Sequence, residues 1–383
     1  MPTNLPPEYF KAEEKYANAR TIEEKIIATQ ELIRVAPKHK GAERLLKTLK
    51  TRLAKLRQEL RKQQTRRVGG GPSFAVKKEG AAQVALLGMP NSGRSTLLRM
   101  LTGAQPEVAP YPFTTREPVP GMMHFEDVQI QLVEVPGVVE GSNLGRGLGA
   151  QPLSVARNAD TIVLTIDLSA DPVKQVEALI GELESAGVKL NKSPPKISIT
   201  RRETGGIEIQ GVELFEGGEA ELKRILQEHR IHNADVDIGE PITAEEIEEA
   251  LDESIVYRRS VIIATKGDAA GATHKLAQLK FAYGGMFPIF LAKREGSPEE
   301  LKRQIFGNLD VIRIYTKRPD EEPAKRPLVL CRGSTVADIA RAVHKDFAHD
   351  LKFARVWGSA RFPGQQVPRS YVLRDKDVVE LHL

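Results

Sequence analysis

The sequence predicts an α/β protein with a doubly wound, mostly parallel sheet at its centre, a helical domain before the sheet and a small mixed domain after it. Short apolar runs suited to buried strands alternate with helical segments between residues 84 and 307. The first of these runs leads into a Gly-rich loop of the phosphate-binding type. Pro-containing joints at residues 68–72 and 317–325 divide the 383 residues, which suffice for two or three domains.

The composition is that of an ordinary globular protein, with 40% hydrophobic and 28% charged residues. No apolar run approaches the roughly 20 residues that span a bilayer, and residues 1–16 lack the pattern of a signal peptide. The single cysteine, Cys331, excludes an internal disulfide and a cysteine-based metal site, and we expect it to be a small buried residue in a strand. We therefore expect a cytoplasmic protein without a membrane segment.

The N-terminal 67 residues predict three helices. Pro7 fits the first turn of the opening helix, and Thr21 with Glu24 has the spacing of a capping box that starts the second. The third helix covers about residues 41–66, and we expect its apolar stripe to pack on the two earlier helices or on the next domain. The stripe consists of Leu45, Leu46, Leu49, Leu53, Leu56 and Leu60.

The third helix is also strongly basic. Residues 40–67 contain eleven Lys or Arg against two Glu, while the whole chain carries a formal net charge of +5. A solvated surface is the ordinary explanation for charged helix residues, but such surfaces usually mix both signs. We favour a surface that faces RNA or the ribosome and, because aromatic residues are not interleaved, contacts the phosphate backbone. The expected contact residues are Lys55, Arg57, Arg61 and Lys62.

A phosphate-binding loop follows the first joint. Val84–Leu87 is suited to a buried strand, and Gly88-x-x-x-x-Gly93-Arg94-Ser95 then matches the P-loop template, with arginine in place of its lysine. Backbone N–H groups of such a loop, together with the following helix N-terminus, cradle the α- and β-phosphates of a nucleotide. The Ser95 hydroxyl is the expected ligand of Mg²⁺.

Two further segments predict the rest of a metal and γ-phosphate site. Residues 109–121 are too rich in proline for regular structure, and a loop of this length in an α/β domain is usually functional. Its Thr114 or Thr115 hydroxyl would complete the Mg²⁺ shell. A second strand, residues 130–137, ends in Glu134 and Gly137. We expect the carboxylate to hold Mg²⁺ through water and the glycine amide to sense the γ-phosphate.

The remaining elements of the sheet predict how the base is selected. Strands are expected at residues 161–167, 261–268 and 287–293, with helices at 173–186 and 298–307. Asp268 ends the motif Thr-Lys-Gly-Asp, and its carboxylate is able to accept hydrogen bonds from the N1–H and 2-amino groups of guanine, which adenine lacks. The stem of Lys266 would pack over the ring, and the Ala292 amide would meet the guanine carbonyl.

Residues 189–258 interrupt the alternation and predict a small α+β insertion. Strands at 196–200 and 207–209 are expected to pair around the turn at 203–206, and helices are expected at 218–230 and 243–253. His229, His232 and Asp235 suggest a metal site, but without a further ligand cluster a surface or core role is favoured.

The residues after the second joint predict a compact mixed sheet with one helix and no acid–base cluster. The helix starts after Thr335, and strands are expected at 328–330, 353–357, 370–373 and 378–383. Trp357 is expected in the core, with a binding surface as the alternative.

The motifs GMPNSGRST, YPFTTREPVPG, VPGVVEGSNLGRGLG and TKGD resemble the G-motifs of the Obg-like translation-factor GTPases. Segments such as ESAGVKLNKSPPKISI and LDVIRIYTKRP resemble the DRG (developmentally regulated GTP-binding protein) branch. TVADIARAVHKDF and YVLRDKDVVEL resemble a TGS domain, a β-grasp module. The resemblance, which covers about residues 40–383, implies a helical domain at 1–67, a G domain at 68–313 with an S5D2-like insertion, and a TGS domain at 314–383.

The resemblance also implies ligands, partners and site residues. It implies GTP or GDP with Mg²⁺, work on the ribosome in translation through the basic helix and the TGS domain, and often a dedicated partner protein. Asn91 matches the asparagine that helps to coordinate K⁺ in potassium-stimulated relatives. Arg94, Thr115 and Gly137 would serve in hydrolysis. The nucleotide-binding positions are Asn91, Ser92, Gly93, Arg94, Ser95, Thr96, Thr265, Lys266, Asp268, Ala292 and Lys293.

The sequence departs from the family pattern at Arg94, Glu134, Thr265 and Leu291, and Val138 stands where Ras-like enzymes have a water-positioning glutamine. Arginine is broad and forked where lysine is a compact point charge, so this replacement is not conservative. Three hypotheses remain. We favour a slow Mg²⁺-dependent and K⁺-stimulated GTPase. The alternatives are a degenerate G domain that binds GDP or GTP without efficient hydrolysis and serves as an RNA- or ribosome-binding module, and an RNA-binding adaptor without nucleotide.

Overall fold

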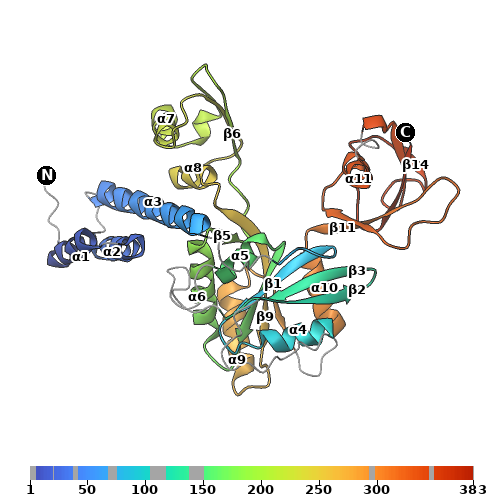
Figure 1. Ribbon diagram of the computed structural model, residues 1–383, viewed down its shortest axis with the longest axis horizontal. Helices are drawn as coiled ribbons and strands as arrows, with labels where there is room; N and C mark the ends of the chain where they lie inside the picture. Colours follow the sequence, from blue (N-terminus) through green and yellow to red (C-terminus); the bar gives the residue numbers. More distant parts are fainter. Residues whose placement is uncertain are drawn as a thin grey trace. The chain divides into compact units, whose positions relative to one another are not determined.

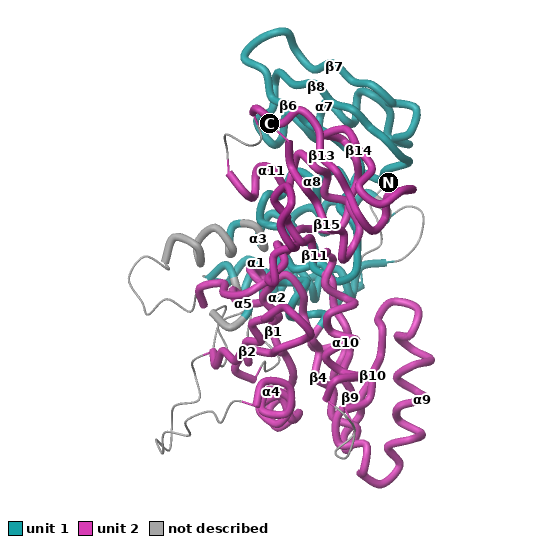
Figure 2. Tube along the Cα trace, turned by 90° about the vertical axis from the view of Figure 1, so that its right-hand side faces the viewer, with its two compact units in different colours: residues 1–73, 140–153, 180–258 teal, residues 74–139, 154–179, 259–383 magenta. Residues whose placement is uncertain are grey.

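The computed structural model describes residues 6–19, 21–37, 42–67, 76–103, 118–137, 151–292, 298–344 and 349–382 (Figure 1). The chain forms two compact units, coloured in Figure 2: residues 1–73, 140–153 and 180–258, and residues 74–139, 154–179 and 259–383. Thr114, Thr115, Val138 and Lys293 lie outside the described residues, as do the side chains of Leu60, Arg57, Arg61 and Lys62. None of the described helices is long and apolar enough to cross a membrane.

The first unit begins with three helices, α1 (Pro7–Asn18), α2 (Ile22–Val35) and α3 (Glu43–Arg67). The predicted capping box is present, since the Thr21 hydroxyl accepts from the Glu24 N–H and the Glu24 carboxylate accepts from the Thr21 N–H. Leu49 is buried with residues of α1 and α2, and Leu56 packs against Ile26 of α2. The apolar stripe of α3 therefore packs on the two earlier helices, which is the first of the two expected arrangements.

The insertion lies in the same unit and has the predicted α+β character, but its strands pair in another order. Its elements are β6 (Ile197–Arg201), β7 (Ile207–Gln210), the 3₁₀ turn η3 (Val212–Leu214), α7 (Gly218–Glu228), β8 (Ala234–Ile238) and α8 (Ala244–Leu251). The predicted β6–β7 hairpin is wrong, because β8 lies between them, antiparallel to β6 and parallel to β7. Ala234, Val236 and Ile238 of β8 are buried in the core of the insertion, which gives β8 the central position.

One of the candidate metal ligands of the insertion, Asp235, has another partner. Asp235 forms an ion pair with Arg202, which directly follows β6. No group of three or more His, Cys, Asp or Glu among the described residues is arranged to hold a metal ion.

The central sheet follows the predicted architecture. Its strands are β1 (Ala82–Gly88), β2 (Val119–Phe125), β3 (Val128–Glu134), β4 (Thr161–Asp167), β9 (Val256–Thr265) and β10 (Ile289–Leu291), in the order β10-β9-β4-β1-β3-β2. All neighbours are parallel except β2 and β3. The short strand β5 (Val188–Leu190) pairs with the first residues of β9. The helices are α4 (Arg94–Thr102), α5 (Gln151–Asn158), α6 (Pro172–Ser185), α9 (Ala272–Tyr283) and α10 (Pro298–Asn308).

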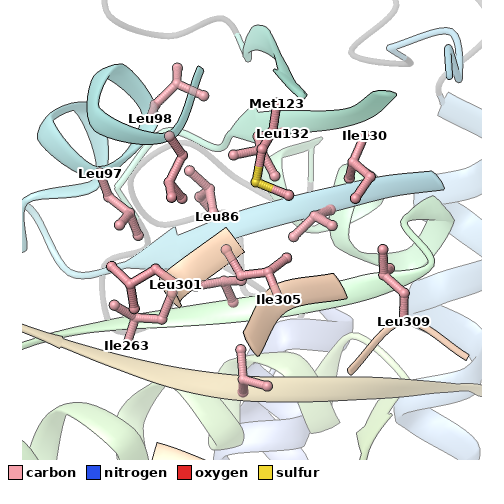
Figure 3. Packing of buried hydrophobic residues seen from close by; sticks show 14 of the residues in the cluster. Leu86, Leu97, Leu98, Met123, Ile130, Leu132, Ile263, Leu301, Ile305 and Leu309 are labelled. Carbon is pink, nitrogen blue, oxygen red and sulfur yellow. The ribbon is translucent and has the colours of Figure 1, made fainter. Parts of the chain in front are cut away.

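One hydrophobic cluster joins this sheet to α4 and α10 (Figure 3). Leu86 and Leu132 come from neighbouring strands, Leu97 from α4, and Leu301 and Ile305 from α10. Strands β1 and β4 are buried along their whole length, as parallel strands covered on both faces must be. The parallel arrangement brings the C-terminal ends of β1, β3, β4 and β9 to one edge of the sheet, where α/β proteins bind ligands.

The C-terminal part is a mixed five-stranded sheet that is accompanied by helix α11 among the described residues. Its elements are β11 (Val311–Thr316), β12 (Leu328–Cys331), α11 (Val336–Val343), β13 (Phe353–Trp357), β14 (Gln365–Val367) and β15 (Asp377–His382), with strand order β12-β11-β15-β13-β14. The predicted strand at 370–373 makes only an isolated bridge, through Val372. Cys331 is exposed, contrary to expectation, because it is the last residue of an edge strand. Trp357 is half-buried and carries the Lys317 ammonium over its ring.

A buried arginine connects β11 to the turn between β2 and β3. Arg313 is only 3% exposed, and its guanidinium contacts Glu126 at 2.6 Å and Asp127 at 3.0 Å in that turn. The same group contacts the Asp375 carboxylate at 2.7 Å and lies over the Phe306 ring of α10. These charge-assisted contacts raise the pKa of Arg313 further above its ordinary value. The arginine therefore stays charged where it is buried.

Candidate nucleotide-binding site

The predicted phosphate loop is a tight turn between β1 and α4. Gly88 ends β1, and a Cβ atom there would lie 2.3 Å from Ser92 Oγ and 2.6 Å from the carbonyl oxygen of Thr165, so that only glycine fits. Gly93 caps α4 at φ +88°, and Asn91 has φ +62°, a left-handed conformation that asparagine tolerates. The loop thus leads directly into a helix N-terminus, whose free N–H groups and dipole favour phosphate. The side chains of Asn91 and Thr96 are exposed beside it.

Of the predicted Mg²⁺ ligands, Ser95 and Glu134 lie among the described residues, and their side chains are in contact. Ser95, in the first turn of α4, donates from Oγ to Glu134 Oε1 at 2.6 Å. Glu134 is the last residue of β3 and lies opposite Leu86 of β1. Hydroxyl and carboxylate oxygens are ligands that Mg²⁺ accepts, with water and phosphate oxygens completing its shell. The residues present therefore fit Mg²⁺ bound together with a nucleotide.

Arg94 takes a position that the sequence alone does not predict. Its side chain is only 8% exposed, and Nη1 donates to the carbonyl oxygen of Val135 at 2.6 Å. Nη2 lies 3.1 Å from the point where a Cβ atom on Gly137 would stand. Burial lowers the pKa of Arg94 from its ordinary value, and the nearby Glu134 carboxylate acts in the opposite direction. The guanidinium thus contacts the segment that was predicted to sense the γ-phosphate.

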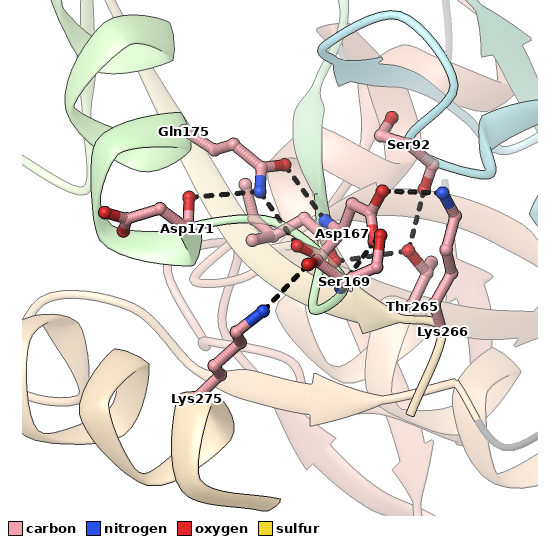
Figure 4. A network of polar contacts seen from close by, with 9 residues as sticks. Ser92, Asp167, Ser169, Asp171, Gln175, Thr265, Lys266 and Lys275 are labelled. Carbon is pink, nitrogen blue, oxygen red and sulfur yellow. Dashed lines mark hydrogen bonds and ion pairs between the residues drawn. The ribbon is translucent and has the colours of Figure 1, made fainter. Parts of the chain in front are cut away.

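The predicted base-binding motif follows β9. Thr265 is buried and donates from Oγ1 to the carbonyl oxygen of Ser92 at 2.7 Å, which ties the end of β9 to the phosphate loop (Figure 4). Lys266 has φ +54°, and its ammonium contacts Asp167 Oδ2 at 2.6 Å. The side chain of Asp268 is exposed at the same edge of the sheet. Thr265 therefore ends β9 and fixes the loop, while Lys266 and Asp268 follow the strand, which is shorter than the predicted 261–268.

Asp167 is a site residue that the sequence reasoning missed. It is the last residue of β4, and it accepts hydrogen bonds from the N–H and hydroxyl of Ser169 besides its ion pair with Lys266 (Figure 4). Burial by itself would raise the pKa of Asp167, but the contacts with Lys266 and Ser169 outweigh it and hold the pKa below its ordinary value. The signal was available, because an acidic residue at the end of a buried strand also identified Glu134.

The amide of Ala292 does not have the expected freedom. Its N–H donates to the carbonyl oxygen of Ala264 at 2.8 Å, continuing the hydrogen bonds between β10 and β9. A contact from this N–H to a guanine carbonyl would have to replace the bond to Ala264, and it stays a prediction. Leu291, which replaces a serine of the family motif, packs so closely on Gly267 that a Cβ atom there would lie 2.9 Å from Leu291 Cδ1.

Among the predicted RNA-contact residues, Lys55 has a described side chain, and it forms an ion pair within the chain. Its ammonium lies 3.3 Å from Glu228 Oε2 of α7. The basic face of α3 is therefore not simply solvated.

A doubly wound sheet with a P-loop, a paired serine and acidic residue, and a Lys-x-Asp motif defines a P-loop GTP-binding protein. The model of the family described as "50S ribosome-binding GTPase" matches residues 83–201, and that of the "C-terminal region" of the same domain matches residues 204–311. The TGS domain model matches residues 312–383.

Whole-chain similarity identifies the family. An uncharacterized GTP-binding protein of Methanocaldococcus jannaschii is 37% identical over 365 residues, which cover 94% of this chain and 92% of that protein. Developmentally-regulated G-protein 2 of Arabidopsis thaliana is 34% identical over 352 residues, covering 90% and 87%. The YchF GTPase structure of Schizosaccharomyces pombe aligns with 80% of this chain and 99% of that one at 15% identity and a TM-score of 0.46. The chain belongs to the Obg-like family of GTP-binding proteins that carry a TGS domain.

Proposed function

We propose that this protein is a slow, Mg²⁺-dependent and K⁺-stimulated GTPase of the DRG type that acts with the ribosome or structured RNA in translation. The observation that carries the proposal is the 2.6 Å contact between Ser95 Oγ and Glu134 Oε1 beside the phosphate loop. Oxygen ligands next to a phosphate cradle would suit Mg²⁺ bound together with a nucleotide. Relatives named developmentally-regulated G-proteins, at 34% identity, support the DRG branch.

Each residue of the site has a defined task in this proposal. Ser95 would ligate Mg²⁺, Glu134 would hold it through water, and the hydroxyl of Thr114 or Thr115 would complete its shell. Bound Mg²⁺ would neutralise charge on the phosphates. The N–H of Gly137 receives the γ-phosphate.

Guanine is selected at the other end of the site. Asp268 accepts from the N1–H and the 2-amino group of the base, and the stem of Lys266 covers the ring. The ion pair with Asp167 supports this orientation, because it holds the Lys266 ammonium at the end of β4.

K⁺ is assigned to the exposed Asn91 on its resemblance to the asparagine of potassium-stimulated GTPases. A monovalent cation beside the phosphates would neutralise charge in the transition state, as an arginine finger does. Val138 lacks the amide of the glutamine that positions water in Ras-like enzymes, so the protein needs such a device.

The position of Arg94 favours a second candidate function, a G domain that binds GDP or GTP without efficient hydrolysis and serves as an RNA- or ribosome-binding module. The guanidinium is tied to Val135 and stands next to Gly137. It must leave that carbonyl oxygen before it is able to pair with phosphate, and a charged donor gives up such a bond at a cost of about 1.5–3 kcal/mol. Occupation of this space opposes entry of a γ-phosphate more than it opposes binding of GDP.

The proposed macromolecular partners follow from charge and domain content. The basic helix α3 suits a phosphate backbone, and the TGS domain is the proposed second contact with the ribosome. We also propose a dedicated partner protein of the kind found for DRG proteins, and a cytoplasmic location.

Nucleotide calorimetry followed by phosphate release tests these proposals. GDP, GTP and ATP are titrated in Mg²⁺, and guanine nucleotides are expected to bind at least tenfold more tightly than ATP. Release of phosphate is then compared in K⁺ and Na⁺, with ribosomes present, for wild type and Asn91→Ala. Faster release by the wild type in K⁺ supports the GTPase. Guanine-nucleotide binding with release no faster than that of Asn91→Ala refutes it and supports the second candidate, while the absence of GDP binding refutes both.

A further inference from the structure

Three lysines of α3 form ion pairs with the insertion inside the first compact unit. Lys50 lies 3.0 Å from Glu245 of α8, and Lys55 lies 3.3 Å from Glu228 of α7. Lys47 contacts Glu221 of α7 as well. We call Lys47, Lys50 and Lys55 the basic row of α3. Each of them contacts an acidic residue that is remote in sequence.

The spacing on each helix makes this contact an extended one. Lys47 and Lys55 are eight residues apart on α3, and Glu221 and Glu228 are seven apart on α7, so that both pairs span about two helical turns. Another face of α3 is covered by α1 and α2 through Leu49 and its neighbours. The three lysines therefore pair with α7 and α8, while the apolar stripe of α3 packs on α1 and α2.

The charges of the two segments are complementary over their whole length. Residues 40–67 contain eleven Lys or Arg and two Asp or Glu, and residues 218–251 contain three Lys or Arg and ten Asp or Glu. Arg224 of α7 also contacts Glu221 at 3.5 Å and Glu228 at 2.7 Å, so these two glutamates are shared between α3 and α7. Burial, with Glu228 and Glu245 nearby, raises the pKa of Glu248 in the same groove.

These ion pairs are suited to exchange. The side chains of Lys47, Lys50 and Lys55 are each about 60% exposed, and exposed pairs contribute little to stability and weaken with salt. An RNA backbone presents many phosphates at once and gains from the release of counterions when lysines bind it. A polyanion is therefore able to replace the glutamates one pair at a time.

We infer that the acidic face of α7 and α8 is a built-in competitor of RNA for the basic row of α3. RNA binds Lys47, Lys50 and Lys55 only as it displaces Glu221, Glu245 and Glu228, so that the insertion restrains the RNA affinity of the N-terminal helices. This inference rests on the proposed binding of RNA by α3 and names the regulation of that same surface. It extends the surface to Lys47 and Lys50.

Binding of a labelled RNA hairpin to the full-length protein, measured by fluorescence anisotropy over a range of KCl concentrations, tests the inference. The competitor variant carries Glu221→Gln, Glu228→Gln and Glu245→Gln. Its matched control carries Glu203→Gln, Glu213→Gln and Glu216→Gln, which remove the same charge from exposed positions of the insertion. Circular dichroism of each variant checks the helix content. We expect the competitor variant to bind RNA at least about threefold more tightly than the control, because three exposed ion pairs are absent.

The salt dependence separates competition from a general change in charge. In the control, the glutamates that RNA displaces take up cations and offset part of the cation release from RNA, so the slope of log K against log [KCl] should be steeper in the competitor variant by about 2. Equal affinities and equal slopes of the two variants overturn the inference.

A variant of the three lysines tests whether RNA binds the basic row at all. Lys47→Gln, Lys50→Gln and Lys55→Gln together should weaken RNA binding at least tenfold and reduce the salt slope. Unchanged RNA binding by this variant overturns the inference, and unchanged binding after charge reversal at Arg57, Arg61 and Lys62 as well overturns the proposed role of α3. Weakened binding, with no difference between the competitor variant and its control, overturns the inference alone.

Discussion

Replacement of Arg94 by lysine probes the phosphate end of the site most directly. The arginine makes a 2.6 Å hydrogen bond to the Val135 carbonyl oxygen, and a bond from a charged donor contributes about 1.5–3 kcal/mol. Lysine is shorter and lacks the forked geometry. We expect the free energy of unfolding of the nucleotide-free protein to fall by about 1–3 kcal/mol in Arg94→Lys.

The same change should tighten GTP binding, because no guanidinium has to be pulled away from Val135 and Gly137. A gain of about 1.5–3 kcal/mol corresponds to roughly 10- to 150-fold in affinity. GDP should gain less, because the contact lies at the segment that receives the γ-phosphate. Phosphate release should also become faster.

Urea denaturation of the free protein and calorimetry with GDP and GTP measure both effects. Arg99→Lys is the matched control, since Arg99 lies exposed on the same helix and its Nε makes only a 3.4 Å contact to Ser95 O. The reasoning is refuted if Arg94→Lys gives the same unfolding free energy as wild type, or if GDP and GTP gain equally.

Other residues give sharper tests of single contacts. Asp268→Ala should weaken GDP binding at least tenfold in calorimetry, because each hydrogen bond to the carboxylate contributes about 1.5–3 kcal/mol. Binding of inosine diphosphate, which lacks the 2-amino group, should weaken less. Equal losses of affinity for the two nucleotides would contradict the assignment. The lowered pKa of Asp167 stabilises the folded state fully above the ordinary pKa of about 4, and this contribution is lost as the pH falls below that value. The unfolding free energy of Asp167→Asn should therefore decline less steeply with acid than that of the wild type, and parallel pH profiles would argue against it. Arg313→Met should destabilise the protein by about 3 kcal/mol in thermal unfolding, because it leaves carboxylates without their shared cation. Adding Asp375→Asn to this variant should restore part of the lost stability. No recovery of stability would count against the ionic explanation.

The sequence predicts the central sheet well because its strands are short apolar runs bounded by recognisable motifs. β1 and β4 are buried on both faces and are therefore apolar throughout. β8 has the sequence ADVDI, whose aspartates are unusual in a central strand, and it was missed for that reason. Without β8, the pairing of β6 with β7 was the simplest arrangement.

The candidate site was predictable where a residue type at a motif position has one ordinary role. It was unpredictable where one donor has more than one possible acceptor. Ser95 and Glu134 fit a metal-binding pattern, and they are in contact. The sequence does not reveal that Arg94 chooses a carbonyl oxygen, because the length and rotamer of the side chain decide which acceptor it reaches. The position of Ala292 likewise depends on how far the ladder between β10 and β9 extends, and strand ends are poorly specified by residue preferences.

The buried Arg313 makes β3 a strand with a different attachment at each end. Glu126 and Asp127, just before β3, contact the arginine of β11, and Glu134 at its other end contacts Ser95. Seven residues of extended chain, with hydrogen-bonded neighbours on both sides, separate these points by only about 23 Å. A chain cut before β11 would leave the two acidic residues without their cation, so nucleotide chemistry measured on an isolated G domain would describe a differently supported strand.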